Sequence, residues 1–208
     1  MTVADPIVHA FDGLASRVDA TGFRTVGFTS ALLGEGVSTI ALGTALALAA
    51  LRQEKVLLVD ANWIQPSLTV DAHLEGTPGL ADHLANGADL MAVVRPALRS
   101  HLAFLPIGDR TGTRPTLRAL AAFLARDVAA FQTVVVDLPP ILVGEAFLLP
   151  WTTLLDQLFV VLREAATPLK LVRQALDRID LVAPPHIVLN RTTAPLVDLS
   201  ATLRAART

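Results

Sequence analysis

The residues best suited to chemistry lie in one glycine-rich stretch, TSALLGEGVSTIA, at positions 29–41. The stretch follows a short apolar run and precedes a long helical pattern, which is the strand–loop–helix context of a phosphate-binding loop. Gly34 and Gly36 would let the backbone approach a phosphate, and the Ser38 hydroxyl could bind Mg²⁺. The N-terminus of the following helix would face the anion. The stretch therefore predicts an anion site of the nucleotide-binding kind.

The loop lacks the cation on which such a site depends. In the pattern GxxxxGK[ST], Val37 stands at the lysine position and Ala31 at the first glycine. Phosphoryl transfer rests on positioning and charge neutralisation, and a valine supplies no charge. A charge-assisted hydrogen bond contributes about 1.5–3 kcal/mol, so its loss should weaken nucleotide binding roughly ten- to a hundredfold. Two interpretations stay open: a loop that still binds nucleotide weakly, or glycines that only turn the chain.

Short apolar runs that alternate with helical patterns would position this loop. The runs lack polar alternation, as strands buried on both faces do, and they occupy residues 25–30, 55–60, 101–107, 133–137, 157–162 and 186–190. The helical patterns occupy residues 37–52, 79–86, 115–131, 167–181 and about 196–206. This order predicts an α/β fold with a doubly wound, mainly parallel sheet flanked by helices.

Local signals refine these boundaries. Pro115 suits the first turn of its helix, and Thr167 suits an N-cap followed by Pro168 at the first helical position. The segment GDRTGTRP at 108–115 gathers glycines and charges, which favours a mobile loop. Apolar residues at helical spacing before the first strand predict an amphipathic helix, whose role as a packing element or a docking element stays open. The cluster at 147–151 is equally compatible with core and interface.

The composition favours one domain without a membrane span. Of the 208 residues, 52% are hydrophobic and 17% charged, and the longest uncharged run, 37–51, is shorter than the roughly 20 residues that cross a bilayer. There is no signal-peptide pattern, no cysteine and no clustered histidine, and the net charge of -2 gives no reason to expect nucleic acid. We expect a cytoplasmic protein with an N-terminal helical segment at 1–24 and a single α/β domain at 25–208.

Six landmarks, taken in order, resemble the bacterial tyrosine kinase branch of the MinD/ParA-like P-loop ATPases, which serves capsule and exopolysaccharide assembly. The landmarks are TSALLGEGVST (29–39), VLLVDANWIQPSL (56–68), GLADHLANGADL (79–90), LAFLPIG (102–108), VVVDLPP (134–140) and IVLNR (187–191). The resemblance runs from about residue 25 to residue 191. It implies that the domain at 25–208 is a P-loop NTPase-like domain of the MinD/ParA type.

The resemblance also implies a nucleotide site beyond the carboxyl ends of the strands. It assigns Asp60 as a Walker A′ aspartate, Asp137 as a Walker B aspartate and Asn190 as a residue facing adenine. The implied nucleotide-binding residues are Gly34, Glu35, Gly36, Val37, Ser38, Thr39, Asn190 and Arg191. If nucleotide binds, Ser38, Asp60 and Asp137 would hold Mg²⁺. Because an acid at a strand end can instead cap the following turn, we regard both aspartates as vestigial rather than catalytic.

Wherever this sequence departs from the bacterial tyrosine kinases that it resembles, it lacks a functional group that they have. Those kinases typically read DADLRRP where this sequence reads DANWIQP, so Asn62, Ile64 and Gln65 replace one acid and two bases. Their ring-forming helix would map near residues 8–17, where only Arg17 is basic. They autophosphorylate a tyrosine-rich tail, whereas this sequence contains no tyrosine. We therefore expect no tyrosine autokinase activity and weak or absent ATPase activity.

Two functions follow from these features. The first is a degenerate pseudo-kinase that needs no cofactor. It would regulate or scaffold exopolysaccharide, capsule or holdfast synthesis by binding a membrane-embedded polysaccharide co-polymerase or export protein, at the inner face of the membrane. The second is an active MinD/ParA-type ATPase switch for positioning or assembly, using ATP or ADP with Mg²⁺. Its replacement cation would be Arg24, Arg110, Arg114 or Arg191. A homodimer is compatible with both, and a site for some other anion ranks last.

Overall fold

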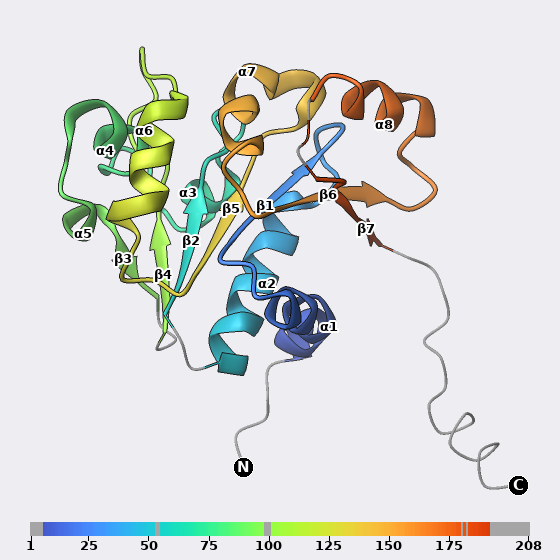
Figure 1. Cartoon of the computed structure of the whole chain (residues 1–208), viewed down its shortest axis with the longest axis horizontal. Helices are drawn as coiled ribbons and strands as arrows, with labels where there is room; N and C mark the ends of the chain where they lie inside the picture. Colours follow the sequence, from blue (N-terminus) through green and yellow to red (C-terminus); the bar gives the residue numbers. More distant parts are fainter. Residues whose placement is uncertain (1–5, 53–54, 98–100, 180, 182, 192–208) are drawn as a thin grey trace, which may run out of the picture.

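The protein is described by a computed structural model that covers residues 6–52, 55–97, 101–179, 181 and 183–191. Its centre is a seven-stranded sheet in the order β3-β4-β2-β5-β1-β6-β7 (Figure 1). All neighbouring strands run parallel except β3 and β4. The strands are β1 Thr25–Ser30, β2 Val56–Asp60, β3 Arg95–Pro96, β4 Leu102–Leu105, β5 Thr133–Asp137, β6 Gln157–Arg163 and β7 His186–Asn190. The predicted α/β class and the doubly wound, mainly parallel sheet are confirmed.

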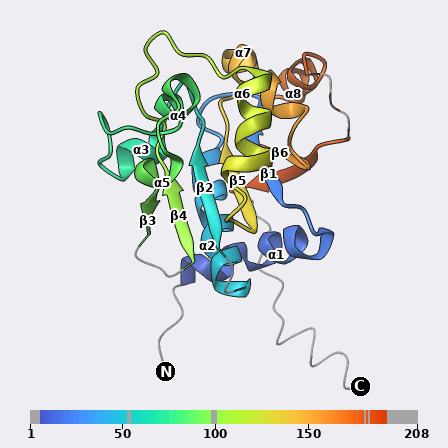
Figure 2. The same ribbon diagram turned by 60° about the vertical axis from the view of Figure 1, so that its left-hand side comes forward.

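Helices cover both faces of the sheet. They are α1 Pro6–Thr21, α2 Val37–Arg52, α3 Ser67–Asp71, α4 Leu80–Asn86, α5 Leu90–Val93, α6 Leu117–Ala122, α7 Ile141–Thr152 and α8 Leu169–Leu176, with a π-helical turn at Phe123–Asp127. Residues of α1, α2 and α3 share one core, and residues of α4 to α8 share the other. The turned view places α4 and α5 at the β3–β4 end of the sheet (Figure 2).

The strands join the two cores because successive side chains point to opposite faces. In β2, Leu57 and Val59 belong to the core beneath α4 to α8, whereas Val56 and Leu58 belong to the core beneath α2. Every residue of β2 and β5 is buried. This two-sided burial explains why these segments read as uninterrupted apolar runs in the sequence.

The helix boundaries depart from the sequence-based predictions where capping decides them. Thr116 is the N-cap of α6, its hydroxyl accepting from Ala119 N at 3.2 Å, so Pro115 precedes the helix instead of opening it. The predicted helix at 115–131 also changes to a π-helical turn after α6. Pro168 is the N-cap of α8, so Thr167 lies outside that helix.

Two other predicted helices are shorter than expected or lie outside the described residues. In addition, the structure contains elements that were not predicted. The helix predicted at 167–181 is observed only as α8, and the helix predicted at 196–206 falls outside the described part of the chain. Four elements were not predicted: α3, α5, α7 and β3. Three of them have two to five residues, too few for hydrophobic periodicity, and α7 is apolar on all sides and contains Pro150.

Helix α1 packs along α2. Ala15 and Val18 are buried in the core that α2 covers, and a Cβ atom at Gly43 of α2 would lie 2.3 Å from the ring of Phe11. The small residue in α2 is therefore what lets the two helices approach. Among the residues that the structure describes, no helix is both long and apolar enough to cross a membrane.

Candidate phosphate-loop site

The phosphate-loop segment lies between the carboxyl end of β1 and the first turn of α2, as the glycine spacing predicts. Gly34 and Gly36 adopt φ values of +80° and +89°, a region that L side chains rarely enter. At Gly36 a Cβ atom would also lie 2.3 Å from Asn190 Nδ2, whereas space is open around Gly34. Both glycines are thus required by backbone conformation, and Gly36 is required by packing as well.

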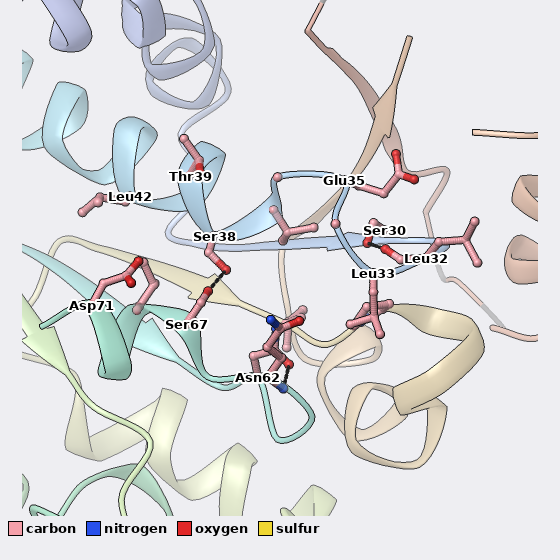
Figure 3. A pocket seen from close by; sticks show the side chains of 17 residues that line it. Ser30, Leu32, Leu33, Glu35, Ser38, Thr39, Leu42, Asn62, Ser67 and Asp71 are labelled. Atoms are coloured by element: carbon pink, nitrogen blue, oxygen red, sulfur yellow. Dashed lines mark hydrogen bonds between the residues drawn. The ribbon is translucent and has the colours of Figure 1, made fainter. Parts of the chain in front are cut away.

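A cavity of about 320 Å³ opens beside this loop. Its wall is formed by the loop, the first residues of α2, the β2–α3 connection, α3 and the start of the segment leading into α7 (Figure 3). The polar side chains that line it include those of Ser30, Ser38, Thr39, Asn62, Gln65 and Ser67. Ser67 Oγ donates a hydrogen bond of 2.7 Å to Ser38 Oγ across the cavity. The proposed Mg²⁺ ligand Ser38 therefore already has a hydroxyl partner.

Val37, at the lysine position, is a packing residue. Its side chain is 8% exposed and belongs to the core beneath α2, together with Ile40 and Ala41. The only charged residues among those lining the cavity are Glu35 and Asp71, both acidic. Among the described residues, no lysine or arginine lines the cavity in place of the missing lysine.

Asp60 and Asp137 lie side by side at the carboxyl ends of β2 and β5, because the parallel register pairs these two residues. Both are completely buried, and neither is among the residues that line the cavity. The Asp60 carboxylate accepts hydrogen bonds from Asn62 N, Thr69 N and Thr69 Oγ1 at 3.1, 2.9 and 2.8 Å. These contacts are those of a residue that caps the β2–α3 turn. In contrast, both carboxylate oxygens of Asp137 lack a hydrogen-bond partner within the described residues.

Burial controls the protonation of this acid pair. It raises the pKa of Asp60 to about 6, against the opposing effect of the hydrogen bonds from Thr69 and Asn62. Burial also raises the pKa of Asp137 well above the usual range, and the neighbouring Asp60 charge raises it further. The Ser38 hydroxyl is near enough to oppose the rise for Asp137, although its geometry falls short of a hydrogen bond.

Comparison with known proteins agrees with this geometry, although no family model matches the sequence. The succinoglycan biosynthesis transport protein ExoP of Rhizobium meliloti is 32% identical over 180 residues, which are 81% of this chain and 22% of ExoP. The tyrosine-protein kinase YwqD of Bacillus subtilis is 32% identical over 122 residues, 57% of this chain and 51% of YwqD. This chain thus spans about a fifth of ExoP and half of YwqD.

A solved structure, the kinase domain of VpsO, superimposes with a TM-score of 0.74 at 25% identity, covering 90% of this chain and 95% of that domain. The chain has the MinD/ParA-like P-loop fold of the bacterial tyrosine kinases. Within that fold, the loop at 34–39 lies between β1 and α2, and Asp60 and Asp137 end β2 and β5. Their assignment as P-loop, Walker A′ and Walker B residues stays a prediction of the resemblance.

Asn190, expected to face adenine in the P-loop fold, contacts the loop itself in this structure. Its Nδ2 donates to Glu35 O at 2.8 Å, and its Oδ1 accepts from Arg191 N at 2.8 Å. Neither Asn190 nor Arg191 is among the residues that line the P-loop cavity. The cavity lies on the α3 side of the loop, so the structure does not bring these two residues together with Ser38 and Thr39.

Glu35 ties the P-loop to the neighbouring strand. Its side chain is 6% exposed, and the carboxylate accepts hydrogen bonds from Arg163 N and Thr167 Oγ1. Together with the Asn190 contact, this links the loop to the carboxyl ends of β6 and β7. The sequence places Glu35 in the loop but does not reveal this role, because only the fold brings residues 163 and 167 to it.

The candidate replacement cations lie elsewhere. Arg24 precedes β1 at the opposite end of the sheet, where its Nη2 donates to Phe131 O at 3.3 Å. Arg110 Nη1 donates to Trp63 O at 2.6 Å, and the Arg114 guanidinium lies 5.8 Å from the centroid of the Phe147 ring. Trp63 Nε1 in turn donates to Thr113 O at 3.1 Å. The segment expected to be a mobile loop therefore has three fixed contacts.

The residues present offer few groups to a magnesium nucleotide. The Asp137 carboxyl has oxygen atoms of the kind that Mg²⁺ prefers, but it is completely buried, does not line the cavity and has a raised pKa that favours the neutral acid. A triphosphate would meet no lysine or arginine in the described lining of the cavity. Among the described residues no cluster of three or more His, Asp or Glu could hold a metal ion by itself.

Proposed function

We propose that this protein is a catalytically degenerate relative of the bacterial tyrosine kinases that acts through protein contacts. Its role would be regulation or scaffolding of the synthesis and export of an exopolysaccharide, capsule or holdfast. Its partner would be a membrane-embedded polysaccharide co-polymerase or export protein, which would hold it at the inner face of the membrane.

The observation that carries the proposal is the burial of Val37 in the core beneath α2. A kinase needs positive charge at the transferred phosphate, and the lining of this cavity offers only Glu35 and Asp71. The absence of tyrosine from the sequence agrees with the loss of kinase chemistry. The link to polysaccharide rests on the similarity to ExoP, a succinoglycan biosynthesis transport protein.

Isothermal titration with ATP and ADP, with and without Mg²⁺, tests the catalytic half of the proposal. The wild-type protein should release no heat of binding at micromolar nucleotide and should not hydrolyse ATP. Val37→Lys should bind at least about tenfold more tightly, because it restores a charge-assisted contact. Val37→Met, which adds length without charge, is the matched control. Steady Mg²⁺-dependent hydrolysis by the wild type, abolished by Asp137→Asn, would refute the proposal.

Polymer secretion tests the biological half. Deletion of the gene should reduce the amount or change the chain length of one secreted polysaccharide, and the wild-type gene should restore it. Asp137→Asn should restore it equally well, because a scaffold has no need of a metal ligand. Failure of Asp137→Asn, at normal protein level, would contradict the scaffolding role.

A second candidate is an active ATPase switch, because Ser38 and the unpartnered Asp137 carboxylate are retained. Since no described arginine lines the cavity, its cation would come from another subunit. Such an enzyme would hydrolyse ATP with a rate per subunit that rises with protein concentration. A rate per subunit that stays at background over a hundredfold concentration range would eliminate this candidate.

A further inference from the structure

A second hollow, here called the α3 groove, lies beside the P-loop cavity. It has a volume of about 530 Å³ and is lined by α2, α3, the edge strand β3 and its neighbours β4 and β2. Its walls are mostly apolar, with Leu58, Leu102 and Phe104 of the sheet at the base. This volume is within the range of about 300–1,000 Å³ that is usual for ligand sites.

The groove exists because helices cover one face of the sheet incompletely. On this face α2 packs mainly across β1, β2 and β5, and α1 lies on the side of α2 that faces away from β4 (Figures 1 and 2). Among the described residues, the short helix α3 and the edge of α2 around Leu42 are what approach the β3–β4 end on this side. Leu42 of α2 is left 37% exposed at the resulting gap.

The α3 groove and the P-loop cavity share part of their lining. Leu42, Leu68 and Asp71 line both hollows. Leu42 and Asp71 lie close together at the α3 end of the P-loop cavity, away from Glu35 (Figure 3). A ligand that filled the groove with apolar groups would therefore place its next polar group beside Asp71 and the loop hydroxyls.

The charges where the α3 groove meets the P-loop cavity favour a cationic group on the ligand. The Asp71 side chain is exposed and makes no hydrogen bond or ion pair with the described residues. The P-loop cavity beyond it has no lysine or arginine in its lining. The single base of the groove, Arg95, lies at the β3 end, where its Nη1 donates to Ala92 O at 2.7 Å.

We propose that the α3 groove binds a segment of a partner protein that carries bulky apolar side chains followed by a basic residue. The apolar side chains occupy the groove over Leu102 and Phe104, and the basic side chain pairs with Asp71 at the mouth of the P-loop cavity. This deepens the proposed scaffolding function and rests on it, since it assigns the surface through which the partner is held.

Fluorescence anisotropy with labelled peptides tests this assignment on the full chain. The first probe is a ten-residue peptide with two adjacent leucines followed by two lysines in a glycine–serine background. In the second probe glutamates replace the lysines, and in the third serines replace the leucines. The first probe should bind saturably and at least fivefold more tightly than either of the other two. Equal affinity for all three, or no saturable binding, would overturn the proposal.

Two leucines of α2 provide a matched pair of variants. Leu42 and Leu51 are 37% and 52% exposed, but only Leu42 lines the groove. Leu42→Glu should weaken the first probe at least tenfold, whereas Leu51→Glu should change its affinity less than twofold. Asp71→Lys should weaken the first probe and strengthen the glutamate probe. Equal effects of the two leucine variants would contradict the assignment.

Other occupants give distinguishable results. Because the chain contains no cysteine, Leu42→Cys can carry a single benzophenone label. An intramolecular cross-link to residues 192–208 that excludes the first probe would show that the chain covers its own groove. Sedimentation of the protein with anionic vesicles, lost in Leu42→Glu but not in Leu51→Glu, would assign the groove to lipid. Either result would overturn the proposal.

The assignment of the α3 groove and the proposed function can be refuted independently of each other. Normal polysaccharide in the deletion strain, together with binding of the first probe, would refute the function and leave the groove assigned. Altered polysaccharide that Leu42→Glu restores as well as the wild type would leave the function and refute the groove as its docking surface.

Discussion

At the scale of single residues, the P-loop has kept its shape and lost its charge. Gly34 and Gly36 hold the backbone in the left-handed region, which is the conformation that a phosphate loop uses. At the position of the essential lysine, Val37 packs into the core. The acids behind the loop remain, and their burial gives them unusual titration behaviour.

The Asp60–Asp137 pair should make the folded state less stable as the pH rises. A carboxyl group whose folded pKa is raised stabilises the fold below its unfolded pKa of about 3.9, and this contribution is lost as the pH rises through the folded pKa. For Asp60 the loss falls between about pH 3.9 and pH 6, and for Asp137 it continues to higher pH. Asparagine cannot ionise, so Asp137→Asn should be more stable than the wild type at pH 8.

Urea unfolding of the wild type and Asp137→Asn from pH 5 to pH 8 measures this effect. The difference between the two proteins should shrink towards pH 5, because pH 5 is closer to the unfolded pKa of about 3.9, below which the carboxyl is protonated in both states. A variant that is less stable than the wild type at pH 8 would show that the ionised carboxylate has a stabilising partner.

The two loop glycines should differ in their tolerance of a side chain. Gly34→Ala and Gly36→Ala both place an L residue at positive φ, which costs about 1–2 kcal/mol. Only Gly36→Ala also drives a Cβ atom to 2.3 Å from Asn190 Nδ2. We expect Gly36→Ala to be the more destabilising in chemical unfolding. The Asn190→Ala background should reduce the difference between the two substitutions, and an unchanged difference would contradict the clash.

At the scale of elements, the P-loop is attached to the strands on one side and open on the other. Glu35 and Asn190 link it to the ends of β6 and β7, while the cavity lies between the loop and α3. The attachment joins segments more than a hundred residues apart in the sequence. The loop is thus positioned by the sheet as well as by its own glycines.

Removal of the Glu35 attachment should destabilise the protein. Glu35→Ala removes the carboxylate that accepts from the half-buried Arg163 amide and the Thr167 hydroxyl, which keep only their longer bonds to each other at 3.0 and 3.2 Å. This loss should cost about 1–3 kcal/mol. The control is Glu145→Ala, which removes an exposed 3.5 Å ion pair with Arg178 and should cost less than about 1 kcal/mol. Unfolding in urea measures both, and equal effects would argue against the attachment.

At the scale of the whole molecule, one sheet separates two cores, and α1 belongs to the outer layer of one of them. The described tryptophans, Trp63 and Trp151, lie in the core on the opposite face from α1 and α2. Tryptophan fluorescence therefore monitors the unfolding of one core, while a substitution can be made in the core on the other face of the sheet. This arrangement allows a direct test of whether the two cores unfold together.

Gly43→Ala should lower the stability of both cores by the same amount. Alanine normally stabilises a helix interior by about 1 kcal/mol relative to glycine, but here its Cβ atom would meet the Phe11 ring at 2.3 Å. We expect the melting temperature to fall equally by tryptophan fluorescence and by far-ultraviolet circular dichroism, and Phe11→Ala to relieve the clash. A shift seen only by circular dichroism would mean that α1 and α2 unfold separately.

The sequence by itself determined the fold class, six strands and the position of the loop. Continuous apolar runs identify strands buried on both faces, and the spacing of Gly34 and Gly36 before a long helical pattern identifies the loop. The missing lysine is likewise visible without a structure. These features are local, because each depends on residues close together in the chain.

Only the tertiary structure decided how the site residues are used. Asp60 caps a turn through Thr69, Asn190 holds the loop in place of facing an open site, and Glu35 reaches Thr167. The lining that the P-loop cavity shares with the α3 groove comes largely from α3, a helix too short to leave a periodic signal. The physical reason is that hydrogen-bond partners and hollows form between segments distant in sequence, and their spacing is set by the packing of helices on the sheet.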